Sequence, residues 1–288
     1  MDPRKPSSMA TVLYVFCLLF SVLVLSAGIM AHSQTSGFEQ IRLSIAGDRI
    51  AVRAAQANGI YAKYGLVAQS DYKSVKDLRG RALIVDAPNT AMALMMRRIL
   101  VLNGVNPDRD CEIKPSATGA QRFALMRESK AYAAAMMAPP NSIVAKREGF
   151  VSLGSASEII GPMHNSSVFV RRKWAQEHTE LLVRFIMASI EAQRWIILPA
   201  NKLPVINLIA QENKTPFDVA SQTYELEVNS PGGWNKDARF SVDNFKNVLK
   251  LRQDIEGTWG TKLPPPDRYY DPIYYERALG KIKISAQS

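Results

Sequence analysis

The stretch that decides the fold is residues 81–140, RALIVDAPNTAMALMMRRILVLNGVNPDRDCEIKPSATGAQRFALMRESKAYAAAMMAPP. Three short apolar runs, at residues 82–86, 112–115 and 132–137, alternate with two longer segments whose apolar residues recur at helical spacing. Strands that alternate with helices are joined by crossover connections, and such connections lead to parallel pairing. The stretch therefore predicts an α/β unit with a parallel sheet.

Small polar and glycine residues follow the first two of these strands, where the helices begin. Helix N-termini carry unpaired backbone amides and favour anions, and open α/β sheets bind ligands at the carboxyl edge of their strands. The alternative is that these residues are ordinary helix caps, and one residue can serve both purposes. The candidate ligand-binding residues in the two turns are Asn89, Thr90, Ala91, Thr118, Gly119 and Arg122.

The composition is that of a globular protein. At 288 residues, with 47% hydrophobic and 22% charged residues, the chain can hold one large domain or two small ones. The formal net charge of +10 is compatible with plain solubility, and more specifically favours an anionic ligand or a negatively charged membrane surface. Lysine and arginine are spread along the chain without a basic run, so we expect no nucleic-acid partner.

The sequence carries no pattern typical of an enzyme or a cofactor site. Its three histidines, His32, His164 and His178, share no metal-ligand spacing, and neither a GxSxG elbow nor a nucleotide-binding glycine pattern is present. We therefore expect a non-enzymatic protein without a metal or cofactor. His164 has two interpretations, a structural residue or a ligand group, and is retained as a candidate ligand-binding residue.

The N-terminus has the layout of an export signal. Arg4 and Lys5 precede an apolar segment at residues 10–30, and small residues at 31–33 offer a cleavage site before Gln34. The segment is also long enough for an uncleaved membrane anchor. Either interpretation places the rest of the chain outside the cytoplasm.

The same patterns predict further elements outside residues 81–140. A first strand at 41–46 ends in a turn at Gly47 and Asp48, and no strand is expected directly after residue 66. The other expected elements are a helical turn at 74–80, a helix at 142–148, a strand at 150–153, a connector at 155–160, and helices at 173–198, 203–212, 217–227 and 240–252, of which 240–252 is the last long one.

Several segments carry a family resemblance. SVKDLRGRALIVDAPNTAMALMMRRIL, WAQEHTELLVRFIMASIEAQRWI and the closing YYDPIYYERAL resemble the nitrate/sulfonate/taurine-type (NitT/TauT) substrate-binding proteins of bacterial ABC importers. The resemblance implies a two-lobed periplasmic-binding-protein fold of type II that closes on a small ligand. It also implies ligand contacts from residues 89–91 and 118–119 in the second lobe, and from Gly47 and Asp48 in the first.

The sequence departs from the family pattern at one place. After residue 66 the family has further strands and helices of the first lobe, whereas here the chain runs almost directly into the approach to the DLRG turn at 77–80. Compared with the family pattern, at least one βαβ unit, roughly 30 residues or more, is absent. The expected organisation is a signal peptide or anchor at 1–33, a truncated first lobe with C-terminal helices at 38–72 and 165–288, and an intact second α/β lobe at 73–164.

The sequence therefore predicts a monomeric periplasmic solute-binding protein. Its expected ligand is a small organic anion (a sulfonate, a nitrate-like ion, an aromatic carboxylate or a pyrimidine-type molecule), and its expected partner is an ABC permease. The truncation leaves two outcomes open, because the remaining lobe either binds through its own turns or binds poorly. The alternative function is a truncated, non-transporting, membrane-tethered interaction or sensory module.

Overall fold

The computed structural model describes residues 64–116, 118–164, 167–229 and 235–285. All of the described residues belong to one compact unit. The predicted export signal, the strand at 41–46 and the turn at Gly47 and Asp48 lie outside the described residues. The predicted lobe boundaries stay a prediction.

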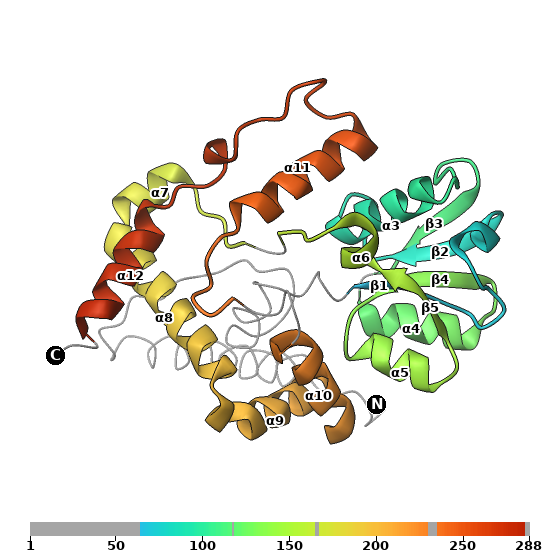
Figure 1. The fold of residues 1–288 in the computed structure, drawn as a ribbon, viewed down its shortest axis with the longest axis horizontal. Helices are drawn as coiled ribbons and strands as arrows, with labels where there is room; N and C mark the ends of the chain where they lie inside the picture. Colours follow the sequence, from blue (N-terminus) through green and yellow to red (C-terminus); the bar gives the residue numbers. More distant parts are fainter. Residues whose placement is uncertain (1–63, 117, 165–166, 230–234, 286–288) are drawn as a thin grey trace, which may run out of the picture. The chain divides into compact units, whose positions relative to one another are not determined.

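A five-stranded mixed sheet lies at the centre of the N-terminal half of this unit (Figure 1). Its strand order is β3-β2-β4-β1-β5, with β2 parallel to both β3 and β4, and β1 antiparallel to both β4 and β5. The strands are β1 (Gly65–Ala68), β2 (Arg81–Val85), β3 (Cys111–Pro115), β4 (Tyr132–Met137) and β5 (Val151–Ser155). The four strands predicted at 82–86, 112–115, 132–137 and 150–153 are confirmed.

The expectation that no strand follows residue 66 is wrong. Residues 65–68 form β1, which is buried over its whole length and pairs Leu66 with Met136 of β4. Four apolar residues without alternation give no periodic signal. They form a strand because they pair with β4 on one side and β5 on the other. Because β1 and β5 are neighbours, the chain enters and leaves this sheet on adjacent strands.

Helices cover both faces of the sheet, and the alternation of side chains along β2 shows how (Figure 1). Leu83 and Val85 pack in one core with α3 (Ala91–Leu102) and α6 (Ala156–Ile160), while Ile84 points to the other face. There it packs with residues of α4 (Gly119–Glu128) and α5 (Asn141–Arg147). The helices predicted after β2, β3 and β4 are confirmed, but the segment 155–160, predicted as a connector, contains helix α6.

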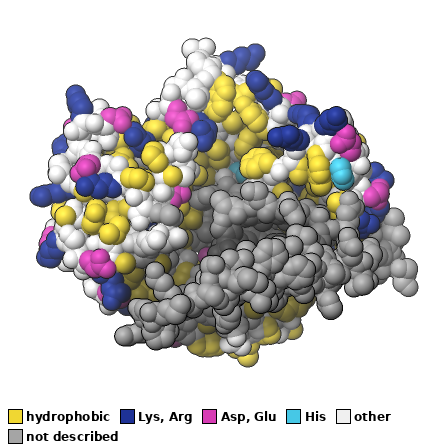
Figure 2. All heavy atoms as spheres, turned by 180° about the vertical axis from the view of Figure 1, so that it is seen from behind, with side chains coloured by type: hydrophobic (Ala, Val, Ile, Leu, Met, Phe, Trp, Pro, Cys, Tyr) yellow, Lys and Arg dark blue, Asp and Glu magenta, His cyan; other side chains and the backbone are white. Residues whose placement is uncertain are grey.

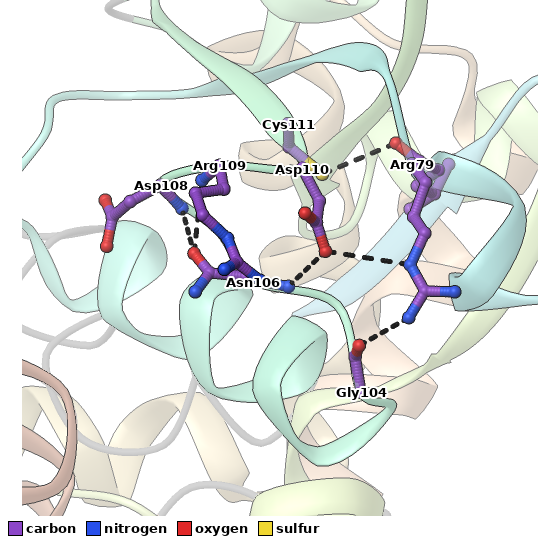
Figure 3. A network of polar contacts seen from close by, with 8 residues as sticks. Arg79, Gly104, Asn106, Asp108, Arg109, Asp110 and Cys111 are labelled. Carbon is purple, nitrogen blue, oxygen red and sulfur yellow. Dashed lines mark hydrogen bonds and ion pairs between the residues drawn. The ribbon is translucent and has the colours of Figure 1, made fainter.

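The turn that leads into β2 is held by polar contacts shown in Figure 3. It follows the short helix η2 (Val75–Leu78), which confirms the predicted helical turn. The Arg79 side chain donates to the Gly104 carbonyl at 2.6 Å and lies 3.6 Å from the carboxylate of Asp110. That carboxylate also accepts the Asn106 amide at 2.9 Å. The contacts tie the start of β2 to the loop between α3 and β3.

The C-terminal half is helical, as predicted. Its elements are α7 (Arg172–Glu177), α8 (Thr179–Ile197), η3 (Pro199–Asn201), α9 (Lys202–Asn213), α10 (Phe217–Tyr224), the π-helix η4 (Glu225–Asn229), α11 (Val242–Glu256), η5 (Pro266–Arg268) and α12 (Ile273–Ser285). Helix α12 extends beyond the predicted last long helix and packs against α8 through a core that includes Val183, Ile190 and Leu279. The proline- and tyrosine-rich approach to α12 masked its helical pattern.

Helices α10 and α11 of the C-terminal half contact helices that cover the sheet. Helix α11 packs against α3, and its Leu251 is part of the core that contains Leu83. On the other side, Arg147 of α5 forms an ion pair with Asp218 of α10, with 2.6 Å between nitrogen and oxygen. The face opposite to that of Figure 1 carries lysine and arginine side chains scattered among acidic and apolar ones over its described part (Figure 2).

We predict that Leu100→Ala lowers the free energy of unfolding by about 2 to 5 kcal/mol, because it leaves a cavity in the core beneath α3. Leu100 is fully buried there. The matched control is Leu102→Ala in the same helix, where the leucine is 49% exposed and the change should stay within about 0.5 kcal/mol. Urea denaturation of both variants tests this, and equal losses would contradict the assigned helix face.

Candidate functional site

Three strand-to-helix turns meet at one edge of the sheet. Because β2 is parallel to β3 and β4, the carboxyl ends of the three strands lie side by side, and α3, α4 and α5 begin just beyond them. The turns are residues 86–90, 116–118 and 138–140, of which residue 117 lies outside the described chain. The prediction that α3 and α4 begin at the same edge is confirmed.

In the first turn, Thr90 caps α3. Its hydroxyl oxygen accepts the Ala93 amide at 3.2 Å, and its hydroxyl group donates to the carboxylate of Asp86. The Thr90 side chain is therefore committed to the protein, as the capping interpretation expected. Within the described chain, the amides of Ala91 and Met92 have no such partner and remain available at the helix start. The exposed Asn89 accepts a long hydrogen bond (3.4 Å) from Arg252 of α11 at its carbonyl.

The second turn has a complete capping box. Thr118 accepts the Gln121 amide at 3.1 Å, and the Gln121 side chain in return accepts from the amide and the hydroxyl of Thr118. The Thr118 hydroxyl, like that of Thr90, is therefore engaged in capping its helix. A Cβ atom at position 119 would lie only 2.8 Å from the side-chain nitrogen Nδ2 of Asn141. The absence of a side chain at Gly119 therefore lets Asn141 approach the start of α4.

Asn141 was missed by the sequence analysis. It lies at the start of α5, after the third parallel strand, and its side chain reaches the start of α4. The signal was available, because a small polar residue follows a strand and a proline pair here much as Asn89 follows Pro88. Three turns, rather than the two that were predicted, therefore contribute polar groups to this edge.

Arg122 is buried beneath the edge and is only 3% exposed. Its Nε donates to the Met136 carbonyl at 3.2 Å, its Nη1 donates to the Ser116 carbonyl at 2.9 Å, and its Nη2 lies 3.6 Å from the Met92 sulfur. Burial lowers the pKa of the guanidinium, and the Asp86 carboxylate acts in the opposite direction. A fixed positive charge therefore lies under the start of α3 and α4.

His164 lies apart from these turns, in an aromatic cluster with Phe240 and Phe245. Its backbone amide donates to the Asn244 carbonyl near the start of α11, whereas Arg252, which reaches Asn89, lies about 12 Å further along that helix. The structure thus brings six of the predicted residues to one edge and places His164 elsewhere. Gly47 and Asp48 lie outside the described residues, and a ligand-binding role for all nine residues stays a prediction.

The described chain has neither a metal-ion cluster nor a membrane-spanning helix. Nowhere in it do three side chains of histidine, cysteine, aspartate or glutamate gather closely enough to hold a metal ion. The helices between residues 64 and 285 that the structure describes include none with the length and hydrophobicity of a membrane span.

A comparison with known families gives the family of this chain. A model described as the NMT1-like family matches residues 22–210, which is more than half of the 288 residues. The chain belongs to the NMT1-like family. No curated protein sequence matches it.

The fold of this NMT1-like chain is that of the type II periplasmic binding proteins. A nitrate-binding protein, NrtA, from Synechocystis PCC 6803 is 16% identical with a TM-score of 0.61, and the match covers 80% of this chain and 67% of that one. The ligand-binding component of an ABC-type import system from Staphylococcus aureus is 12% identical with a TM-score of 0.60, over 77% of this chain and 72% of that one. The aliphatic sulphonate binding protein SsuA from Escherichia coli is 15% identical, with a TM-score of 0.54 and coverage of 77% and 72%.

The solved structures with this fold include an enzyme. The desulfurization enzyme DSZB is 12% identical with a TM-score of 0.51, and the match covers 78% of each chain. The solved structures that resemble this member of the NMT1-like family thus include both transport proteins and an enzyme.

We predict that His164 makes the folded protein less stable in mild acid. Burial lowers its pKa from 6.5 to about 4, so between these values the unfolded chain binds a proton that the folded protein does not. Above pH 6.5 the ionisation of His164 hardly affects the free energy of unfolding. As the pH falls from 6.5 to 4, its destabilising contribution grows. Its share of the loss between pH 7 and pH 5 should be about 2 kcal/mol.

The measurement is urea denaturation of the wild type and His164→Gln at both pH values. The difference between the two proteins isolates this histidine, and the loss should be smaller in His164→Gln. The control is His178→Gln, which leaves His164 intact and should therefore keep the wild-type loss. An equal loss in the wild type and His164→Gln would show that His164 is not buried as described.

Proposed function

We propose that this member of the NMT1-like family is the periplasmic solute-binding component of an ABC importer and that it binds a small organic anion. The observation that carries the proposal is the gathering of the α3 and α4 N-termini at one sheet edge above the buried Arg122. The proposed ligand is a sulfonate, a nitrate-like ion, an aromatic carboxylate or a pyrimidine-type molecule. The proposed partner is an inner-membrane permease, which receives the ligand from a monomer.

The chemistry of the edge favours an anion with several acceptor oxygens. In the described chain, neither a cap nor a helical bond uses the amides of Ala91 and Met92 at α3 or those of Gly119 and Ala120 at α4. Such amides point along the helix axis out of the N-terminus, where the helix dipole is positive. Two helix starts together offer donors to more than one oxygen of a sulfonate or carboxylate.

The names of the related solved structures support the proposal. They include proteins titled as binding aliphatic sulphonate and nitrate. These small anions share a compact group of negatively charged oxygens, which is what backbone amides at a helix start recognise.

An enzymatic function like that of the desulfurization enzyme has less support. The cysteine of the described chain, Cys111, begins β3 and pairs with Arg81, so it lies at the amino edge of the sheet, opposite to the three turns. Burial and the neighbouring Asp110 carboxylate raise the pKa of its thiol. A cysteine that serves an enzyme as a nucleophile needs a lowered thiol pKa, whereas the surroundings of Cys111 raise it.

We predict that at least one member of a panel of ethanesulfonate, nitrate, benzoate and a hydroxymethylpyrimidine raises the melting temperature. At about 100 times its Kd, a ligand that binds only the folded state stabilises it by about 2.7 kcal/mol. For a chain of this size that corresponds to a rise of roughly 5 to 10 °C. No shift with any member at high concentration would contradict the binding function and favour the tethered module.

The location outside the cytoplasm has its own test. Export with cleavage should yield a protein whose first residue is close to Gln34, because small residues precede that position. N-terminal sequencing of the exported protein measures this. A chain that keeps residues 10–30 and stays with the membrane would favour the alternative module.

A further inference from the structure

We infer that Arg122 is a positioning residue of the proposed anion site, which ties the turn at 116–118 to the end of β4 and to the first turn of α3, and which does not itself touch the ligand. The inference rests on the proposed function and names the part that this arginine takes in it. It replaces the simpler expectation, in which Arg122 is a cation that pairs with the anion directly.

The contacts of the guanidinium join three elements. Ser116, which accepts from Nη1, follows β3, and Met136, which accepts from Nε, belongs to β4. Strands β3 and β4 are not neighbours, because β2 lies between them. Arg122 therefore spans the end of β2 and links the two strands that flank it.

The third contact reaches the other layer of the fold. Met92, whose sulfur lies 3.6 Å from Nη2, belongs to the first turn of α3, on the face of the sheet opposite to α4. Arg122 itself belongs to the first turn of α4. The side chain thus connects the first turns of the two helices whose free amides form the proposed site.

The burial of the guanidinium argues against direct contact with a ligand. Only 3% of Arg122 is exposed, and Nε and Nη1 are directed to backbone carbonyls at hydrogen-bonding distance. Arginine presents its donors in a rigid planar fork, so a guanidinium that is held by two carbonyls fixes the chain segments that carry them. In this arrangement the anion binds the backbone amides at the starts of α3 and α4. The Arg122 guanidinium holds the chain segments that carry these amides and does not contact the anion.

A positioning role and a direct charge contact predict different losses. If Arg122 holds the turns, its removal displaces donors that serve any ligand of the right shape, whether charged or neutral. If Arg122 pairs with the anion, its removal weakens only the charged ligand. A lysine should restore binding in the second case alone, because lysine keeps the charge but lacks the planar fork.

The test uses ethanesulfonate and ethanesulfonamide, which have similar shapes but differ in charge. Calorimetric titration of the wild type, Arg122→Met and Arg122→Lys should show that both substitutions weaken both probes by a similar factor, about tenfold or more. The matched control is Arg127→Met in the same helix, because Arg127 is exposed and pairs with Glu148. It should leave both affinities unchanged.

Three outcomes would overturn the inference. They are a loss for the sulfonate alone, recovery of sulfonate binding in Arg122→Lys, and unchanged affinity in both Arg122 variants. Wild-type protein that binds neither these probes nor any of the panel would instead count against the proposed function.

Hydrogen exchange of the ligand-free proteins keeps the inference testable in that case, and also if Arg122→Met does not fold. Exchange in Arg122→Lys should be faster than in the wild type at the hydrogen-bonded amides of the first turns, those of Ala93 and Leu94 in α3 and of Gln121 in α4, and unchanged in α8. Unchanged exchange at the two first turns would show that Arg122 does not hold them.

Discussion

Parallel hydrogen bonding of β2 to a strand on each side is the constraint on which the rest of this structure depends. It forces the chain to cross over from β2 to β3 and from β3 to β4, so that all three strands end at one edge. The crossover helices α3 and α4 lie on opposite faces of the sheet, and both begin at that edge. Polar turns that are far apart in sequence thereby become neighbours, which is the arrangement that open α/β sheets use for ligands.

The price of this arrangement is a charged group buried where the two layers meet. A guanidinium is taken out of water only at a large cost unless its donors are satisfied, and Arg122 meets backbone carbonyls at the ends of two strands. The same contacts that make burial tolerable also fix the turn at Ser116, so the structural role of this side chain and its proposed positioning role rest on the same bonds.

Capping explains how much of the candidate site could be predicted from the sequence. Thr90 and Thr118 each begin a helix with the local hydrogen bonds that their residue types favour, and these bonds depend only on neighbours three residues away. The ends of these strands and helices were therefore predictable from residues 81–140. The orientation of Arg122 and the approach of Asn141 to Gly119 were not, because they depend on contacts between different elements.

The sequence by itself determined the local order of strands and helices, the caps and the family resemblance, since periodicity and helix-end chemistry act over a few residues. Only the tertiary structure decided that residues 65–68 become a strand between β4 and β5, that helix α12 pairs with α8, and that His164 joins an aromatic cluster away from the turns. Each of these outcomes is set by burial against a distant partner. Such partners leave no signal in a short window of sequence, whereas the caps at Thr90 and Thr118 do.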